Sequence, residues 1–97
     1  MPHVVWRANA REDARRIIDY ISDRNPAAAL RHADLFAHVA ERLADHPEMY
    51  RPGRVPDTRE AIVTPNYILI YRVALDRIEI LAVKPVSYTH LTLPTNA

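Results

Sequence analysis

The feature that most restricts the fold is a break of two residues, Arg24-Asn25, between two segments with helical periodicity. In the first segment, residues 10–24, apolar side chains recur at the i, i+3, i+4 and i+7 spacing of an amphipathic helix, at Ala14, Ile17, Ile18 and Ile21. Pro26 follows the break, and an asparagine cap with proline at the first helical position starts a helix well. Because the connection is short, the helices must run antiparallel as an αα-hairpin.

The second helix is expected to begin at Pro26 and to end at His46-Pro47, because the residue before a proline disfavours the α region. Its apolar seam consists of Ala29, Ala33, Phe36, Ala40 and Leu43, with Val39 beside it. Asn9 is the expected N-cap of the first helix, since its side-chain oxygen can accept a backbone N–H there.

Strands are expected on both sides of this hairpin. A short β-prone run, residues 3–6, precedes the first helix, and an irregular connector, residues 47–57, follows the second. Further strands are expected at residues 58–64, 67–74 and 77–84, joined by tight turns at Pro65-Asn66 and Leu75-Asp76. The order β-α-α-β-β-β predicts an α+β domain: an N-terminal strand, the αα-hairpin, and a three-stranded antiparallel meander with the helices over one face.

The middle strand of this meander carries apolar side chains on both faces. Tyr67, Leu69, Tyr71 and Val73 alternate onto one face, and Ile68, Ile70 and Arg72 onto the other. Such a strand belongs in the centre of a sheet. One face is expected to pack on the helical hairpin, and the other to contact something else.

Composition excludes several classes of function. The 97 residues suffice for one domain, and a net charge of +1 lacks the basic excess typical of nucleic-acid modules. The absence of cysteine excludes disulfides, thiolate catalysis and cysteine-based zinc sites. His32 and His38 do not have the i, i+4 spacing of a helical metal site, so no metal or cofactor is expected. Without a signal peptide or a long apolar run, a soluble cytoplasmic protein with no membrane contact is expected.

The last segment, residues 85–97, differs from the rest of the chain. It contains no charged residue and is rich in threonine, leucine and proline. It resembles translated sequencing-adapter read-through at the end of an open reading frame, so we interpret residues 1–84 as the domain and residues 85–97 as an atypical, non-native tail. A mobile native tail is the alternative.

Several short motifs occur in a characteristic order. Residues 51–60 read Arg-Pro-Gly-Arg-Val-Pro-Asp-Thr-Arg-Glu, and the strands at residues 65–73 and 78–81 follow. Upstream lie Val4-Val5-Trp6, Asp19-Tyr20-Ile21, residues 25–29, Arg42-Leu43 and His46-Pro47. Together, over about residues 2–84, they resemble the RelE/ParE superfamily of type II toxins, and its ParE branch in particular. The resemblance implies a compact two-helix and sheet fold and a hetero-oligomer with a cognate antitoxin protein.

Two activities occur in this superfamily: ParE-type toxins inhibit DNA gyrase, and RelE-type toxins cut messenger RNA on the ribosome. RNA cleavage requires a base, an acid and nearby cations. Pro85 stands where many relatives carry histidine, and proline cannot transfer a proton. Gyrase inhibition, which requires no catalytic set, is therefore the leading hypothesis. A ribosome-dependent endoribonuclease and a degenerate, non-toxic antitoxin-binding module are the alternatives.

The candidate functional residues lie in the connector and the strands. For RNA cleavage they are Arg54, Arg59, Tyr71 and Arg72, and for contact with a protein partner they are Arg51, Arg54, Arg59, Glu60 and Arg72. Each also has a structural interpretation. Arg59 and Glu60 are expected to form an ion pair on the solvent face, Arg72 to pair with Glu60 or Glu79, Tyr71 to lie in the core with Tyr67, and Gly53 to provide a positive φ.

Overall fold

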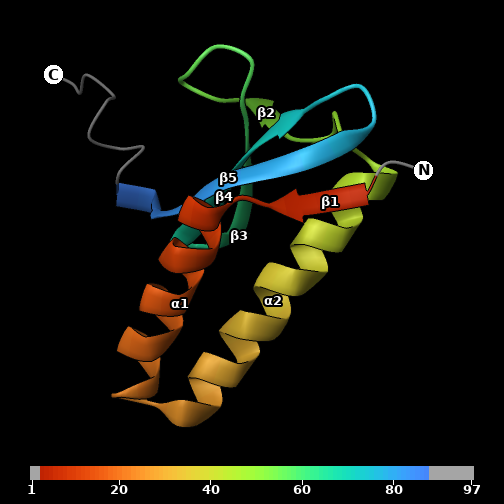
Figure 1. Ribbon diagram of the computed structural model, residues 1–97. Coiled ribbons are helices and arrows are strands. Elements are labelled where there is room, and N and C mark those ends of the chain that lie inside the picture. The colour runs from red at the N-terminus through yellow and green to blue at the C-terminus, as the bar shows by residue number, and fades with distance from the viewer. Residues whose placement is uncertain (1–2, 88–97) are drawn as a thin grey trace, which may run out of the picture.

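The computed structural model describes residues 3–87 (Figure 1). The elements are β1 (His3–Trp6), α1 (Ala8–Ser22), α2 (Pro26–Asp45), β2 (Arg51–Pro52), β3 (Arg59–Thr64), β4 (Tyr67–Val73) and β5 (Arg77–Pro85). The helical hairpin forms one layer and the sheet lies across its open end as the other. This arrangement confirms the α+β class and the order of elements expected from the sequence.

Local signals explain the hairpin. The Asn25 side chain accepts the Ala28 backbone N–H at 3.0 Å, and Pro26 occupies the first turn of α2, as expected. The expected cap at Asn9 is wrong, because α1 already begins at Ala8 and its N-cap residue, Arg7, makes no side-chain cap. The Arg7 backbone N–H donates instead to the Ile80 carbonyl at 2.9 Å, so the chain passes from the sheet directly into the helix.

The sheet has five strands in the order β1-β5-β4-β3-β2. The expected antiparallel meander forms its centre. Two strands extend it beyond the expectation: β1 pairs with β5 in parallel, and β2, inside the connector expected to be irregular, pairs with β3. Periodicity within one strand identifies the strand but not its neighbour, so the sequence did not show these pairings.

The connector contains the only glycine, Gly53, at a close backbone contact. Its N–H donates to the Thr58 carbonyl at 2.7 Å, and a Cβ at Gly53 would lie 2.3 Å from the Thr58 hydroxyl oxygen. Glycine is therefore required for space, and the expected positive φ is wrong. Among the residues that the structure describes, the positive φ in this connector belongs to Asp57, at 67°.

A bulge in β5 decides which of its side chains face the helices. Ile70 is opposite Ala82 whereas Tyr71 is opposite Ile80, so Leu81 is an extra residue in the ladder. The bulge interrupts strict alternation, and Ile80 and Val83 consequently both join the core between sheet and helices.

The core contains most of the residues that the helical and strand periodicities indicated. Its buried members are Ala10, Phe36, Val39, Ala40, Leu43, Ala61, Leu69, Tyr71, Ile78, Ile80 and Val83. Tyr67 packs against them, as expected for a core aromatic. Ala33, expected in the seam of α2, is exposed. The isoleucines of α1 are only partly buried, so this helix keeps apolar surface on both of its flanks.

A buried carboxylate joins α1 to the edge of β5. Strand β1 pairs with β5 only as far as Ile80, which leaves the backbone of β5 beyond that point without a neighbouring strand on this side. Asp13 accepts the Val83 backbone N–H at 3.0 Å through its Oδ2, and its side chain is 10% exposed. Lys84 and Arg16 lie 3.6 and 3.2 Å from its oxygens and balance its charge.

Candidate functional site

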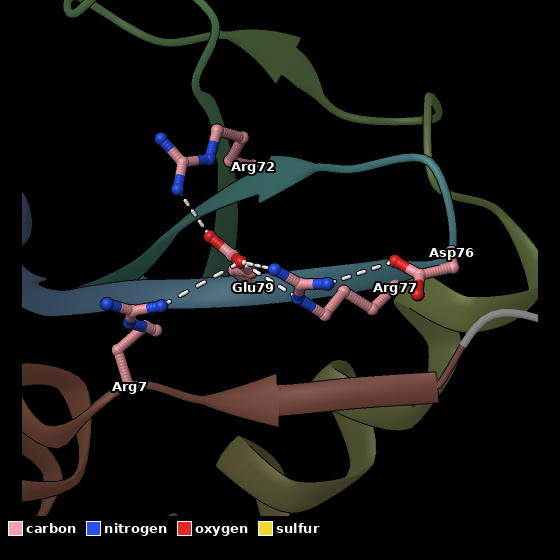
Figure 2. A network of polar contacts seen from close by, with 5 residues as sticks. All are labelled: Arg7, Arg72, Asp76, Arg77 and Glu79. Carbon is pink, nitrogen blue, oxygen red and sulfur yellow. Dashed lines mark hydrogen bonds and ion pairs between the residues drawn. The ribbon is translucent and has the colours of Figure 1, made fainter.

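One face of the sheet is covered by the helices and the other is not (Figure 1). Along β4, Leu69 and Tyr71 point into the helix-covered core, so by alternation Ile68, Ile70 and Arg72 point to the opposite face. We call this second side the open face. It carries a network of arginines around Glu79, seen from close by in Figure 2.

Three arginines from three segments of the chain surround the Glu79 carboxylate (Figure 2). Arg72 of β4 donates to its Oε1, and Arg77 of β5 donates to its Oε2 at 2.9 Å. Arg7, which follows β1, lies 3.8 Å from Oε2. Arg77 also donates to Asp76 at 3.0 Å. The Glu79 side chain is 3% exposed, whereas those of the three arginines are 40–55% exposed.

This geometry determines the charge state of Glu79. The hydrogen bond from Arg72, with that from Arg77 and the positive charges of both, holds the pKa of the Glu79 carboxyl below its ordinary value, although burial opposes the shift. The carboxylate therefore stays ionised at neutral pH. Since it lies beneath the guanidinium groups, a molecule approaching the open face meets the arginines first.

A second buried carboxylate, Glu60 of β3, lies on the same face. Arg51 lies 3.2 Å from its Oε1, and the Arg54 backbone N–H donates to its Oε2 at 3.4 Å. The expected ion pair between Arg59 and Glu60 is wrong, because adjacent residues of a strand point to opposite faces. Of the two partners expected for Arg72, the structure selects Glu79.

Arg59 and Tyr71 are paired across β3 and β4 on the helix-covered side. The Arg59 guanidinium donates to the Tyr50 carbonyl at 2.7 Å and to the Glu48 carbonyl at 3.4 Å. The Tyr71 hydroxyl donates to the Pro47 carbonyl at 2.8 Å, and burial raises the pKa of this phenol. Both side chains thus hold the segment after α2 against the sheet.

Only two of the four candidates for RNA cleavage line the same hollow. Arg59 and Arg72 line one hollow of about 560 Å³ at the end of β4, together with Glu48, Asp57 and Thr58. Tyr71 and Arg54 are not among the residues that line it. The sequence interpretation missed Arg7 and Arg77. Alternation along β5 places Arg77 beside Glu79, but Arg7 arrives only through the parallel pairing of β1.

An apolar groove of about 530 Å³ lies between the two helices beside β1. Its apolar lining consists of Trp6, Ala14, Ile18, Ala33, Phe36 and Ala37, and its charged lining residues are Arg11, Arg15 and Asp19. Within residues 3–87, no three histidine, aspartate or glutamate side chains are placed to hold a metal ion. No described helix is long and apolar enough to span a membrane.

Comparison with known proteins agrees with this architecture. A chain of the chromosomal ParDE toxin-antitoxin system from P. aeruginosa has the same fold, with a TM-score of 0.79 and 22% identity over 88% of this chain and 96% of that one. The conserved hypothetical protein HP0894 from Helicobacter pylori follows with a TM-score of 0.58 and 18% identity over 90% and 97% of the two chains. The fold is therefore that of RelE/ParE-like proteins.

Sequence similarity identifies the family. The family described as "ParE toxin of type II toxin-antitoxin system, parDE" matches residues 4–87. A relative named Toxin RelE2, from Caulobacter vibrioides, is 36% identical over 84 residues, which cover 87% of this chain and 94% of the relative. The chain belongs to this family of toxins, within the RelE/ParE superfamily. The resemblance stated from its motifs is confirmed.

Proposed function

We propose that this toxin stops bacterial growth by binding DNA gyrase, and that a cognate antitoxin protein neutralises it. The proposal rests on one observation: three of the four candidates for RNA cleavage, Arg59, Tyr71 and Arg72, already make contacts within the fold. The Tyr71 hydroxyl is bonded to the Pro47 carbonyl and has a raised pKa, so it is a poor proton carrier. Arg59 is bonded to backbone carbonyls and Arg72 to Glu79. A toxin that acts by binding requires no proton-transfer pair.

The histidines support the same interpretation. Within the described residues none of them lies on β3, β4 or β5, where the candidate arginines are. The Glu60 carboxylate is buried and paired with Arg51, so it is not available as a general acid or base. Beside the candidate arginines, the described residues therefore provide no histidine, only the connector carboxylates Glu48 and Asp57, and this supports recognition over cleavage.

For the antitoxin we propose the groove between the helices as the docking site. Its apolar lining, with Trp6 and Phe36 as the largest side chains, fits the apolar face of a segment that folds on binding. Arg11, which also lines the groove, suits an acidic residue flanking that apolar face, whereas Arg15 is already paired with Glu12 and Asp19. Occupation of the groove would also cover apolar surface that this small domain leaves exposed.

Supercoiling of relaxed plasmid by purified gyrase tests the proposed target. We expect the purified chain to reduce supercoiling, and Tyr71→Phe to reduce it equally, because the hydroxyl only supports the fold. Plasmid topology from arrested cells provides the measurement in vivo. Growth arrest with normal supercoiling would contradict the gyrase proposal. Absence of arrest from a folded chain would instead favour a degenerate module that has lost its toxicity.

Ribosome-dependent cleavage of messenger RNA is the second candidate, and the hollow shared by Arg59 and Arg72 favours it. Two guanidinium groups at one hollow can stabilise charge on a phosphate during cleavage. Primer extension on messages from arrested cells distinguishes the two functions. New ends within codons, abolished by Arg72→Gln while gyrase activity stays normal, would establish the endoribonuclease.

A further inference from the structure

The open face of the sheet is divided along β4 into an apolar half and a cationic half. The fully buried Ile68 and the partly buried Ile70 lie toward one end of the strand and Arg72 toward the other. Ile62 of β3 is opposite Ile68 and is 54% exposed. Glu79 of β5 is opposite Arg72 and gathers the arginines. From residue 68 to residue 72 the strand spans about 13 Å, a length that a short extended peptide matches.

The cationic half holds more positive charge than its carboxylates require. Arg7, Arg72 and Arg77 carry three positive charges, whereas Glu79 and Asp76 carry two negative ones. Glu79 is buried and offers only two oxygens, so guanidinium N–H groups remain available to solvent on each half-exposed arginine. These groups can donate to carboxylates of another molecule.

The buried carboxylate also holds the arginines in place. Arginine side chains lose rotamer freedom when they bind, and this loss opposes association. Contacts with Glu79 remove much of that freedom from Arg72 and Arg77 before any partner arrives. Planar guanidinium groups fixed in this way suit two-pronged hydrogen bonding to carboxylates. Glu79 thus acts as a positioning residue for the surface.

We propose that the open face binds an amphipathic polypeptide segment whose acidic side chains contact Arg7, Arg72 and Arg77 and whose apolar side chains contact Ile62 and Ile70. A nucleic-acid strand fits this face less well, because the exposed Ile62 and the partly buried Ile70 offer no partner to its regularly spaced phosphates. This face lies on the side of the sheet away from the helical groove. The binding test for this inference uses no gyrase, so the inference and the proposed gyrase inhibition can fail independently of each other.

Fluorescence anisotropy with a synthetic probe tests this inference on the full chain. The probe is a short labelled peptide in which a run of glutamates is followed by valine alternating with serine. We expect it to bind, to bind more weakly as salt is raised, and to outcompete both the same peptide with glutamines and a single-stranded oligothymidine. Absence of binding, or tighter binding of the oligothymidine, would overturn the inference.

Single-residue variants test whether the named side chains contact the peptide. Arg7→Gln and Arg72→Gln are each expected to weaken binding about tenfold, the usual effect of losing one charge-assisted hydrogen bond. Ile62→Asn is expected to weaken it as well. Arg31→Gln removes the same charge from α2 and is the matched control, with unchanged binding. Arg7 lies farthest from Glu79, so R7Q keeps the test valid should R72Q unfold. Equal binding by R7Q and R31Q would refute the assignment.

Discussion

Asp13 links α1 to the last strand through one buried carboxylate, and its loss leaves the Val83 backbone N–H without that acceptor. We expect Asp13→Ala to lower the free energy of unfolding by about 2 to 3 kcal/mol, because a buried donor to a charged acceptor is left unsatisfied. Asp13→Asn keeps an acceptor oxygen and is expected to cost about 1 kcal/mol. Urea denaturation followed by circular dichroism measures both.

The control for Asp13 is Asp19→Ala on the same helix. Asp19 is exposed and forms only a surface ion pair with Arg15, so its removal is expected to cost less than about 0.5 kcal/mol. An equal loss for the two alanine variants would show that the contact with Val83 contributes nothing specific.

The lowered pKa of the Glu79 carboxyl predicts that the stability of the fold depends on pH. Its folded-state pKa is lowered, first by the Arg72 hydrogen bond, from an ordinary value of 4.5. A carboxyl with a lowered folded-state pKa binds fewer protons when folded than when unfolded. Its contribution is therefore fully present above the unfolded-state pKa and is lost as pH falls through the folded-state pKa.

We expect Glu79→Gln to be less stable than the original chain at neutral pH, and the difference to shrink as pH falls below 4.5. Urea denaturation across the acid range gives the two curves. Glu12→Gln is the comparison: its pKa is lowered by Arg15, but the pair is exposed, so a much smaller effect is expected. Parallel curves for E79Q and the original chain would contradict the assignment.

At the scale of the elements, two asparagines in helix-start sequences provide a matched pair. Asn25 caps α2 through its side chain, whereas Asn9 lies inside the first turn of α1. Asn25→Ala is expected to cost about 1 kcal/mol because the Ala28 N–H loses its acceptor. Asn9→Ala is expected to be neutral or slightly stabilising, since alanine has the higher helix propensity. Thermal unfolding of the two variants compares them, and a greater loss for N9A would contradict the assigned start of α1.

The bulge in β5 acts at the same scale. It turns Val83 into the core and leaves the Val83 N–H facing Asp13 rather than a neighbouring strand. One extra residue thus determines both a core contact and the attachment of α1. Bulges of this kind redirect side chains where a regular ladder cannot.

For the whole molecule, the end of the domain can be tested by truncation. The sequence interpretation placed the boundary after Lys84, and that boundary remains a prediction. In the structure Pro85 is still paired with Tyr67, and the Val86 N–H donates to the Asn66 carbonyl at 2.7 Å. We expect a chain ending at Lys84 to be less stable than one ending at Ser87 by about 1 kcal/mol, the value of one lost hydrogen bond. Equal denaturation curves would support the boundary at Lys84.

Much of the fold followed from interactions between neighbours in the chain. The cap at Asn25, the proline after it and the i, i+3, i+4 spacing act within a few residues, so they identified the hairpin and most of its core. Alternation along β4 identified the central strand and the side of Arg72. The motif resemblance identified the family, because its motifs keep their order along the chain.

Only the tertiary structure decided how the edges of the sheet are completed and where the arginines meet. The parallel pairing of β1 with β5 brings Arg7 to Glu79, and the edge it leaves is completed by Asp13 of α1. These contacts join residues about seventy positions apart. They depend on which backbone and charged groups remain unsatisfied after the strands have paired, and local periodicity contains no information on that.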